Sequence, residues 1–139
     1  MLCVFSGLRA SRYPVGRRSW SFPQGGWPSG QTGDPEELAR LELAQETGLS
    51  ARELVRLGSL NTAHGITSQA GHYFLATGLE PGKPEREAEE QDMRQAWVSR
   101  ARFEEMIGEG LITDDSTVAA YALLLLRERG SGPWLADRR

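Results

Sequence analysis

The alternation of apolar and polar residues along the chain predicts short strands separated by helices. Residues 2–8 are almost entirely apolar and include Val and Phe, which indicates a buried strand near the start of the sequence. Residues 53–62 and 72–79 have the composition of two strands flanking a loop, and residues 93–99 resemble a further strand. Because these strands alternate with predicted helices, the pattern favours an α/β fold class.

A helix over residues 35–47 is marked at both ends. Asp34 is a typical N-cap, Pro35 takes the first helical position, and Glu37 stands three residues after the cap. Gly48 suits the left-handed position that often ends a helix. Two more helices are predicted, one capped by Ser99 and ending near residue 107, the other starting at residue 115 or 116 and ending near residue 129.

The faces of the first helix carry different chemistry. Leu38, Leu41 and Ala44 recur at three-residue spacing, which predicts an apolar face opposite an acidic one. Glu42 and Glu46 are four residues apart, so they share a face, and their repulsion costs the helix roughly 0.2–0.5 kcal/mol. A divalent cation shared by the pair would turn this repulsion into coordination, because Mg²⁺ commonly takes one or two carboxylates. The alternative is a pair of solvated glutamates on a surface helix.

Proline and glycine mark a loop region between residues 12 and 34. The segments 12–18 and 20–34 are dense in both residues, and aromatic residues are interspersed. We therefore expect loop structure with one short strand at residues 20–22. A second loop, over residues 80–92, is polar and crowded with acidic residues.

The length and composition indicate one globular domain. The chain has 139 residues, of which 39% are hydrophobic and 25% are charged, so neither disorder nor several domains are expected. We predict a single domain over residues 1–130 and a loosely held tail over residues 131–139. The net charge of −3 argues against nucleic acid as a partner. The lone Cys3 excludes an internal disulfide, and the longest apolar stretch is too short for a bilayer, so we expect a cytoplasmic protein without a membrane partner.

The segment "FPQGGWPSGQTGDPEELARLELAQETGL" resembles the Nudix box. That motif reads Gly, five residues, Glu, seven residues, Arg-Glu-apolar, one residue, Glu-Glu, one residue, Gly-apolar. With Gly25 as the first glycine and a two-residue insertion before the helix, Glu42 and Glu46 fall on glutamates of the motif. The resemblance implies a Nudix-type α/β/α sandwich with a mixed central sheet. It also implies that Glu42 and Glu46 hold the Mg²⁺ that bridges a diphosphate, with Mn²⁺ as a substitute.

Two further segments are similar to the ADP-ribose pyrophosphatase-like branch of this family. "RYPVGRRSWSFPQG" precedes the box, and "EGLITDDSTVAAYALLLL" lies near the end of the chain. The resemblance implies that Gln24 offers a backbone carbonyl to the metal and that Arg12 or Arg18 neutralises charge on the diphosphate. A tight turn at Gln24 and solvated surface arginines are the alternatives. Members often also have an N-terminal strand pair that helps form a homodimer and binds the base, whereas this sequence begins at the first core strand.

The sequence departs from the motif at several charged positions. Leu41 replaces the box arginine, and Gln31 and Gln45 replace two glutamates. Gln keeps an oxygen acceptor but has no charge and cannot serve as a base. A glutamate of the branch also falls at Gln69, so we expect the general base elsewhere. The resemblance implies a glutamate several residues before a tryptophan-bearing strand, which deprotonates water or completes the metal shell. Glu89 and Glu90 stand in that relation to Trp97, and Glu90 is the favoured candidate. The alternative is that it only keeps its loop solvated.

Two more side chains are candidates for substrate contact. Trp20 could stack on a nucleobase, or it could anchor the adjacent strand. His64 is expected in a loop where it could touch substrate, and it is not spaced with His72 as a zinc pair.

The resemblance therefore implies Mg²⁺-dependent hydrolysis of a nucleoside diphosphate derivative, with ADP-ribose or a nucleotide sugar as the first choice. Glu42 and Glu46 act as metal ligands and Glu90 as the base in this hypothesis. A Nudix-fold module that binds or senses a nucleotide without turnover is the alternative, and the replacements at positions 31, 41 and 45 favour it.

Overall fold

The computed structural model describes residues 10–12, 17–88 and 91–130. The strand predicted at residues 2–8, the candidate base Glu90 and the predicted tail lie outside these ranges. The described elements, in chain order, are β1 (Ala10–Arg12), β2 (Arg17–Ser19), α1 (Pro35–Thr47), β3 (Ser50–Asn61), β4 (Ala70–Glu80), α2 (Arg100–Gly108) and α3 (Asp115–Glu128).

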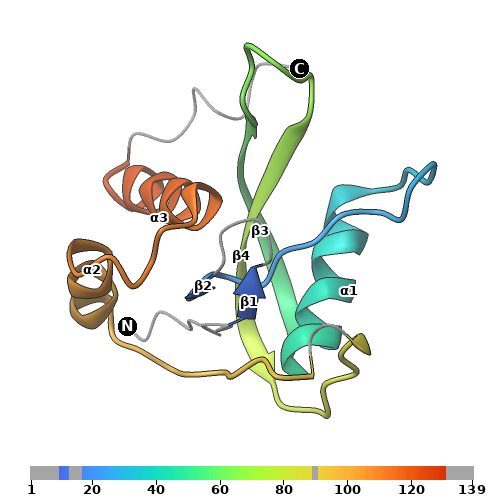
Figure 1. The fold of residues 1–139 in the computed structure, drawn as a ribbon, viewed down its shortest axis with the longest axis horizontal. Coiled ribbons are helices and arrows are strands. Elements are labelled where there is room, and N and C mark those ends of the chain that lie inside the picture. The colour runs from blue at the N-terminus through green and yellow to red at the C-terminus, as the bar shows by residue number, and fades with distance from the viewer. Residues whose placement is uncertain (1–9, 13–16, 89–90, 131–139) are drawn as a thin grey trace.

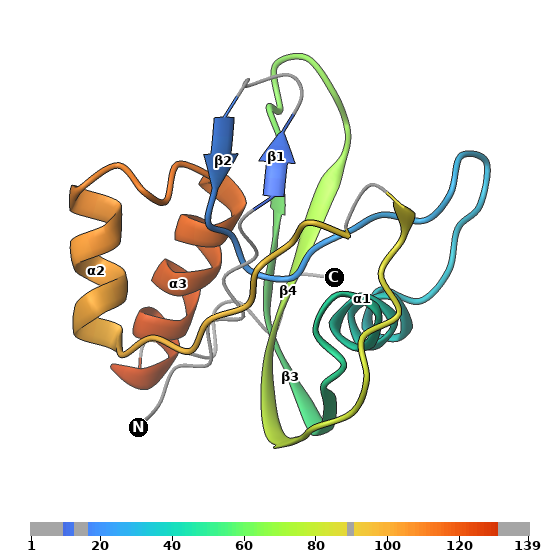
Figure 2. The same cartoon turned by 60° about the horizontal axis from the view of Figure 1, so that its bottom comes forward.

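The elements form three layers around a long hairpin. Strands β3 and β4 stand in the middle, with α1 on one side and α2 and α3 on the other (Figure 1, Figure 2). This arrangement confirms the predicted α/β/α sandwich. The described strand pairs, β1 with β2 and β3 with β4, are both antiparallel, so the mixed character of the sheet stays a prediction.

The two strands of the central hairpin are paired from one end to the other. Ser50 pairs with Glu80 at one end and Asn61 with Ala70 at the other, with an irregularity next to Gly58. A side chain at Gly58 would begin 3.4 Å from Leu123, so this glycine allows α3 to lie close to β3.

The core lies between the hairpin and the α2–α3 pair. Phe103 is fully buried, and its ring lies 4.8 Å from that of Tyr121 and 5.6 Å from that of Phe22. Phe22 is partly buried against this core, so the segment that precedes the glycine-rich loop is anchored there. The buried members of the cluster are Leu57, Phe103, Met106, Ile112, Tyr121, Leu123 and Leu124.

The predicted helix signals are confirmed with small shifts. Helix α1 has the predicted bounds, because the Asp34 carboxylate accepts from the Glu37 N–H at 3.0 Å and Gly48 is left-handed with φ 74°. Ser99 caps α2 as expected. Helix α3 starts at the predicted Asp115, but its cap is Asp114. No helix within the described ranges is long and apolar enough to cross a membrane.

Two strand predictions are wrong. Residues 93–99 are irregular, and the Met93 carbonyl accepts from Arg86 Nη1 at 2.7 Å instead of pairing with a strand. Residues 20–22 also lack strand pairing, since the Phe22 N–H donates to Thr117 Oγ1 on α3. The strand lies earlier, at residues 17–19, in a segment predicted as loop. Its pairing with residues 10–12 gives it a partner that residue types alone do not reveal.

Candidate metal centre and active site

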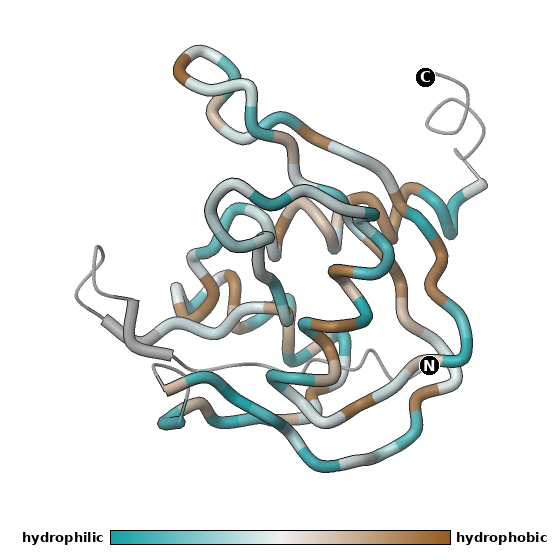
Figure 3. Tube along the Cα trace, turned by 90° about the vertical axis from the view of Figure 1, so that its right-hand side faces the viewer, coloured by the Kyte–Doolittle hydropathy of each residue, from teal (hydrophilic) through white to brown (hydrophobic). Residues whose placement is uncertain are grey.

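The face of α1 that turns toward the protein is not the predicted apolar one. Leu41 is 43% exposed and Ala44 is exposed, whereas Leu43, Glu46 and Thr47 are buried. The predicted apolar face was therefore wrong. Apolar and polar residues alternate along the side of the molecule that carries α1 (Figure 3), so this helix has no clean apolar stripe to fix its rotation.

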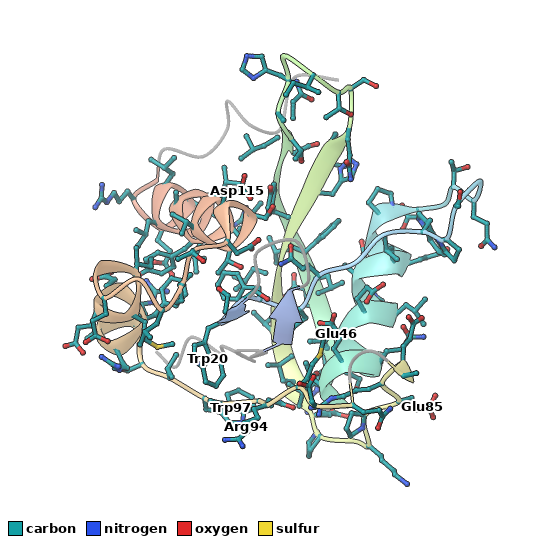
Figure 4. The ribbon with its side chains drawn as sticks, in the orientation of Figure 1. Trp20, Glu46, Glu85, Arg94, Trp97 and Asp115 are labelled. Atoms are coloured by element: carbon teal, nitrogen blue, oxygen red, sulfur yellow. The ribbon has the colours of Figure 1, made fainter. Side chains whose placement is uncertain are left out.

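Glu46 is the most deeply placed carboxylate of this helix. Only 1% of its surface is exposed, and Oε2 accepts from the backbone N–H of Gln24 at 3.3 Å. In Figure 4 its side chain lies on the side of α1 nearest the hairpin. Burying an ionised carboxylate costs several kcal/mol unless charges or hydrogen bonds compensate, and the Gln24 N–H supplies one such hydrogen bond.

Glu42 meets the same loop one residue further along. A Cβ atom added to Gly25 would lie 2.1 Å from Glu42 Oε1 and 2.5 Å from Oε2, so the carboxylate occupies the space that only a glycine leaves open. Glu42 and Glu46 therefore converge on the backbone of Gln24 and Gly25. The four-residue spacing predicted a shared face, and the metal-binding role of the pair stays a prediction.

Helix α3 holds this loop from the other side. Gln24 Nε2 donates to Asp114 Oδ2 at 3.2 Å, and the same oxygen accepts from the Thr117 N–H at 2.8 Å and from Thr117 Oγ1 at 2.6 Å. Thr117 Oγ1 in turn accepts from the Phe22 N–H at 3.0 Å. Neither side chain is among the site residues predicted from the sequence, although both lie in the segment "EGLITDDSTVAAYALLLL" that is similar to the family.

The C-terminal end of α1 is held by the loop that follows β4. Arg86 Nε donates to the Glu46 carbonyl at 2.9 Å, and the Glu85 N–H donates to the Gln45 carbonyl at 2.9 Å. These bonds satisfy carbonyls that a helix end leaves without partners, and the guanidinium opposes the negative end of the helix dipole. Arg86 lies 40 residues beyond Glu46 in the sequence, so no local signal could have found it.

The remaining predicted site residues are not all brought together. Arg12 pairs with Arg17 and Arg18 with Ser11 in the β1–β2 ladder, and their side chains are outside the described part. Trp20 is partly buried against the core, and its backbone N–H donates to the Leu111 carbonyl. Both contacts favour the anchoring alternative. Trp20 also lines a cavity of about 10 Å³, which is too small for a nucleobase. Its stacking role stays a prediction.

His64 lies far from the carboxylate pair. It is exposed in the turn between β3 and β4, at the opposite end of the hairpin from Ser50, which follows α1. Its contact with substrate stays a prediction.

The departures from the motif fall at different depths. Gln31 and Leu41 are exposed, and Gln45 is half-buried on the helix. The losses of charge at positions 31 and 41 therefore lie at the surface.

The carboxylates of Glu42 and Glu46 are the side-chain oxygen donors that lie against the Gln24–Gly25 loop. Within the described ranges, no group of three or more His, Cys, Asp or Glu side chains is placed to hold a metal ion. Two carboxylates of one helix facing a loop suit Mg²⁺, which keeps several ligand positions for water and phosphate oxygens.

Comparisons with known proteins place this geometry in context. A family model described as NUDIX domain matches residues 8–130. An ADP-ribose pyrophosphatase of Bacillus subtilis (strain 168) is 28% identical over 122 residues, which are 87% of this chain and 65% of that protein. The chain thus spans slightly less than two thirds of the length of this relative.

Two solved structures share the fold. A crystal structure of an ADP compounds hydrolase aligns with TM-score 0.74 and 21% identity over 91% of this chain and 66% of that one. A MutT structure from work on Aliivibrio salmonicida and Vibrio cholerae aligns with TM-score 0.52 and 18% identity over 76% of this chain and 78% of that one.

Proposed function

The chain belongs to the NUDIX domain family, and we propose that it is a hydrolase that cleaves the diphosphate linkage of a nucleoside diphosphate derivative with the help of Mg²⁺. The similarity to an ADP-ribose pyrophosphatase and to an ADP compounds hydrolase supports ADP-ribose or a nucleotide sugar as the substrate class. The observation that carries the proposal is the inward position of Glu46, 1% exposed, beside Glu42 and against the Gln24–Gly25 loop.

The residues present fit a magnesium ion. Glu42 and Glu46 would hold it, with the Gln24 carbonyl as a further oxygen ligand and Mn²⁺ as a substitute. The absent Cβ at Gly25 gives the Glu42 carboxylate its place, which supports a cradle built for a charged group. When bound, the ion supplies positive charge that neutralises the diphosphate.

Individual backbone and side-chain groups then have separate tasks. The Gln24 N–H orients the Glu46 carboxylate. Arg12 or Arg18 would place a guanidinium against the diphosphate oxygens, where it stabilises charge that develops during hydrolysis. Glu90 would take the proton of the attacking water.

A substrate panel with a matched pair of variants tests the proposal. Purified protein is incubated with ADP-ribose, nucleotide sugars and other nucleoside diphosphate derivatives, with Mg²⁺, Mn²⁺ or chelator. We expect metal-dependent release of nucleoside monophosphate. The control variant Glu37→Gln should keep this activity, because Glu37 is exposed on the same helix. Glu46→Gln should lower kcat/KM by about 10²-fold or more, the scale at which misplaced or missing catalytic groups act. Equal activity of the two variants would refute the proposal.

A nucleotide-binding module without turnover is the second candidate. The uncharged residues Gln31, Leu41 and Gln45 at charged positions of the motif favour it. Tight nucleotide binding without hydrolysis at any metal concentration in the same panel would support the module.

A further inference from the structure

We propose that Asp114 and Thr117, at the start of α3, are positioning residues that hold Gln24 against the Glu46 carboxylate and so set the geometry of the metal site on α1. The inference rests on the proposed function, since it concerns the same site. Asp114 and Thr117 do not face the substrate in this proposal, because they act through Gln24.

A continuous series of hydrogen bonds joins the two helices. The Asp114 carboxylate accepts from Gln24 Nε2 at 3.2 Å, and the Gln24 N–H donates to Glu46 Oε2 at 3.3 Å. One residue therefore contacts α3 through its side chain and α1 through its backbone. A shift of α3 relative to the loop would move the Gln24 backbone away from the Glu46 carboxylate.

The preceding residues are tied to the same region at every second position. The Trp20 N–H donates to the Leu111 carbonyl at 3.2 Å, the Phe22 N–H to Thr117 Oγ1 at 3.0 Å, and Gln24 Nε2 to Asp114. The backbone N–H groups of Trp20 and Phe22 and the side-chain amide of Gln24 thus all donate to the segment from Leu111 to Thr117. The Gln24 backbone N–H donates to Glu46 on α1 instead.

The first turn of α3 is more than an ordinary helix cap. A single oxygen of Asp114 accepts three donors, and Thr117, which is 1% exposed, both donates to that oxygen and accepts from Phe22. By contrast, the Ser99 side chain at the start of α2 accepts from the Arg102 N–H on its own helix. Ser99 therefore provides a matched control, a cap without a connection to the loop.

The loop is open to solvent at Gly26. That residue is exposed, and an added Cβ there would meet no atom within 4 Å. The hydrogen bonds of Phe22 and Gln24 come shortly before this exposed residue, so they help to place the part of the loop that meets Glu42 and Glu46.

Four variants of the full chain test the proposal. Thr117→Val removes the hydroxyl at nearly constant volume, and Thr117→Ser keeps it. Gln24→Met removes the side-chain amide but keeps the backbone N–H. Ser99→Ala weakens a cap elsewhere. Each is measured by amide hydrogen exchange of Phe22 and Gln24, by Mn²⁺ affinity from titration calorimetry, and by urea unfolding.

Thr117→Val and Gln24→Met should each speed hydrogen exchange of the backbone N–H at position 24 by at least about tenfold. Each should also weaken Mn²⁺ binding by about 10-fold to 100-fold, the usual effect of losing an outer-shell partner. Thr117→Ser should behave like the parent protein. Ser99→Ala should lower the urea midpoint without changing either readout.

The proposal is overturned if Ser99→Ala weakens Mn²⁺ binding as much as Thr117→Val does, because the effect would then be general loss of stability. It is also overturned if folded Gln24→Met keeps the parent exchange rates. If Thr117→Val does not fold, Gln24→Met decides. If the parent protein binds no Mn²⁺, the proposed metal function fails, and amide exchange alone supports or overturns the tie between α3 and the loop.

Discussion

Replacing Gly25 with alanine would place a methyl group where the Glu42 carboxylate now lies. The added Cβ would be 2.1 Å from Glu42 Oε1 and 2.2 Å from Cδ. Because comfortable contacts between heavy atoms are about 3.5–4.0 Å, the carboxylate must retreat by about 1 Å or more. The obstacle is the end of a flexible side chain rather than backbone, so the fold can accommodate the methyl while the site cannot.

The change should therefore separate activity from stability. Gly25 is not among the glycines with positive φ, so alanine fits its backbone, and loss of unfolded-chain freedom would contribute about 0.4–1 kcal/mol of stability. We expect Gly25→Ala to stay within about 1 kcal/mol of the parent protein in free energy of unfolding. A displacement of about 1 Å at a reacting centre can cost about 10²-fold in rate, and we expect a loss of kcat/KM on this scale.

The assay is an Mg²⁺ titration of the initial rate with ADP-ribose, combined with urea unfolding. Gly26→Ala is the matched control, because an added Cβ there meets nothing within 4 Å. If Gly25→Ala and Gly26→Ala show the same Mg²⁺ dependence and the same kcat/KM, then the Glu42 carboxylate does not act where the structure places it. A large loss of stability in Gly25→Ala would equally contradict the reasoning.

Three further predictions concern the loop after β4 and the helix pair. Glu90→Gln should lower kcat by about 10²–10⁴-fold with unchanged Mg²⁺ dependence, against Glu85→Gln as an exposed control in the same loop; equal rates would remove Glu90 as the base. Arg86→Met leaves two carbonyls without their donor and should cost about 1–3 kcal/mol in urea unfolding, while an unchanged midpoint would show that the contact is dispensable. Hydrogen bonds from Arg100 hold the pKa of Glu128 below its usual range. A lowered pKa contributes stability above the ordinary pKa of about 4.3 that is lost as pH falls through the folded value. Glu128→Gln should therefore cost roughly 0.2–1 kcal/mol at pH 7 and progressively less as pH falls below about 4.3, and a pH-independent difference would refute this.

The resemblance of residues 22–49 to the Nudix box is confirmed by the family match.

The two wrong strand predictions have a common cause. Residues 93–99 have strand-like composition but no strand pairing, and residues 17–19 are polar yet pair with residues 10–12. Pairing depends on a distant partner, which composition does not report.

The sequence by itself determined the local features of this protein. Asp34, Pro35 and Gly48 set the ends of α1, because capping needs only neighbouring residues. The four-residue spacing likewise fixed Glu42 and Glu46 on a common face.

Only the tertiary structure decided which face of α1 turns inward. The Leu38, Leu41 and Ala44 spacing pointed to another face, yet Glu46 is buried and Leu41 is not. The partners that make this burial tolerable come from distant segments, with Gln24 bonded to the carboxylate and Arg86 to the carbonyl of the same residue. When apolar and polar residues are mixed around a helix axis, no apolar stripe fixes which face turns toward the core. Long-range packing and hydrogen bonds then decide the orientation of the helix about its axis.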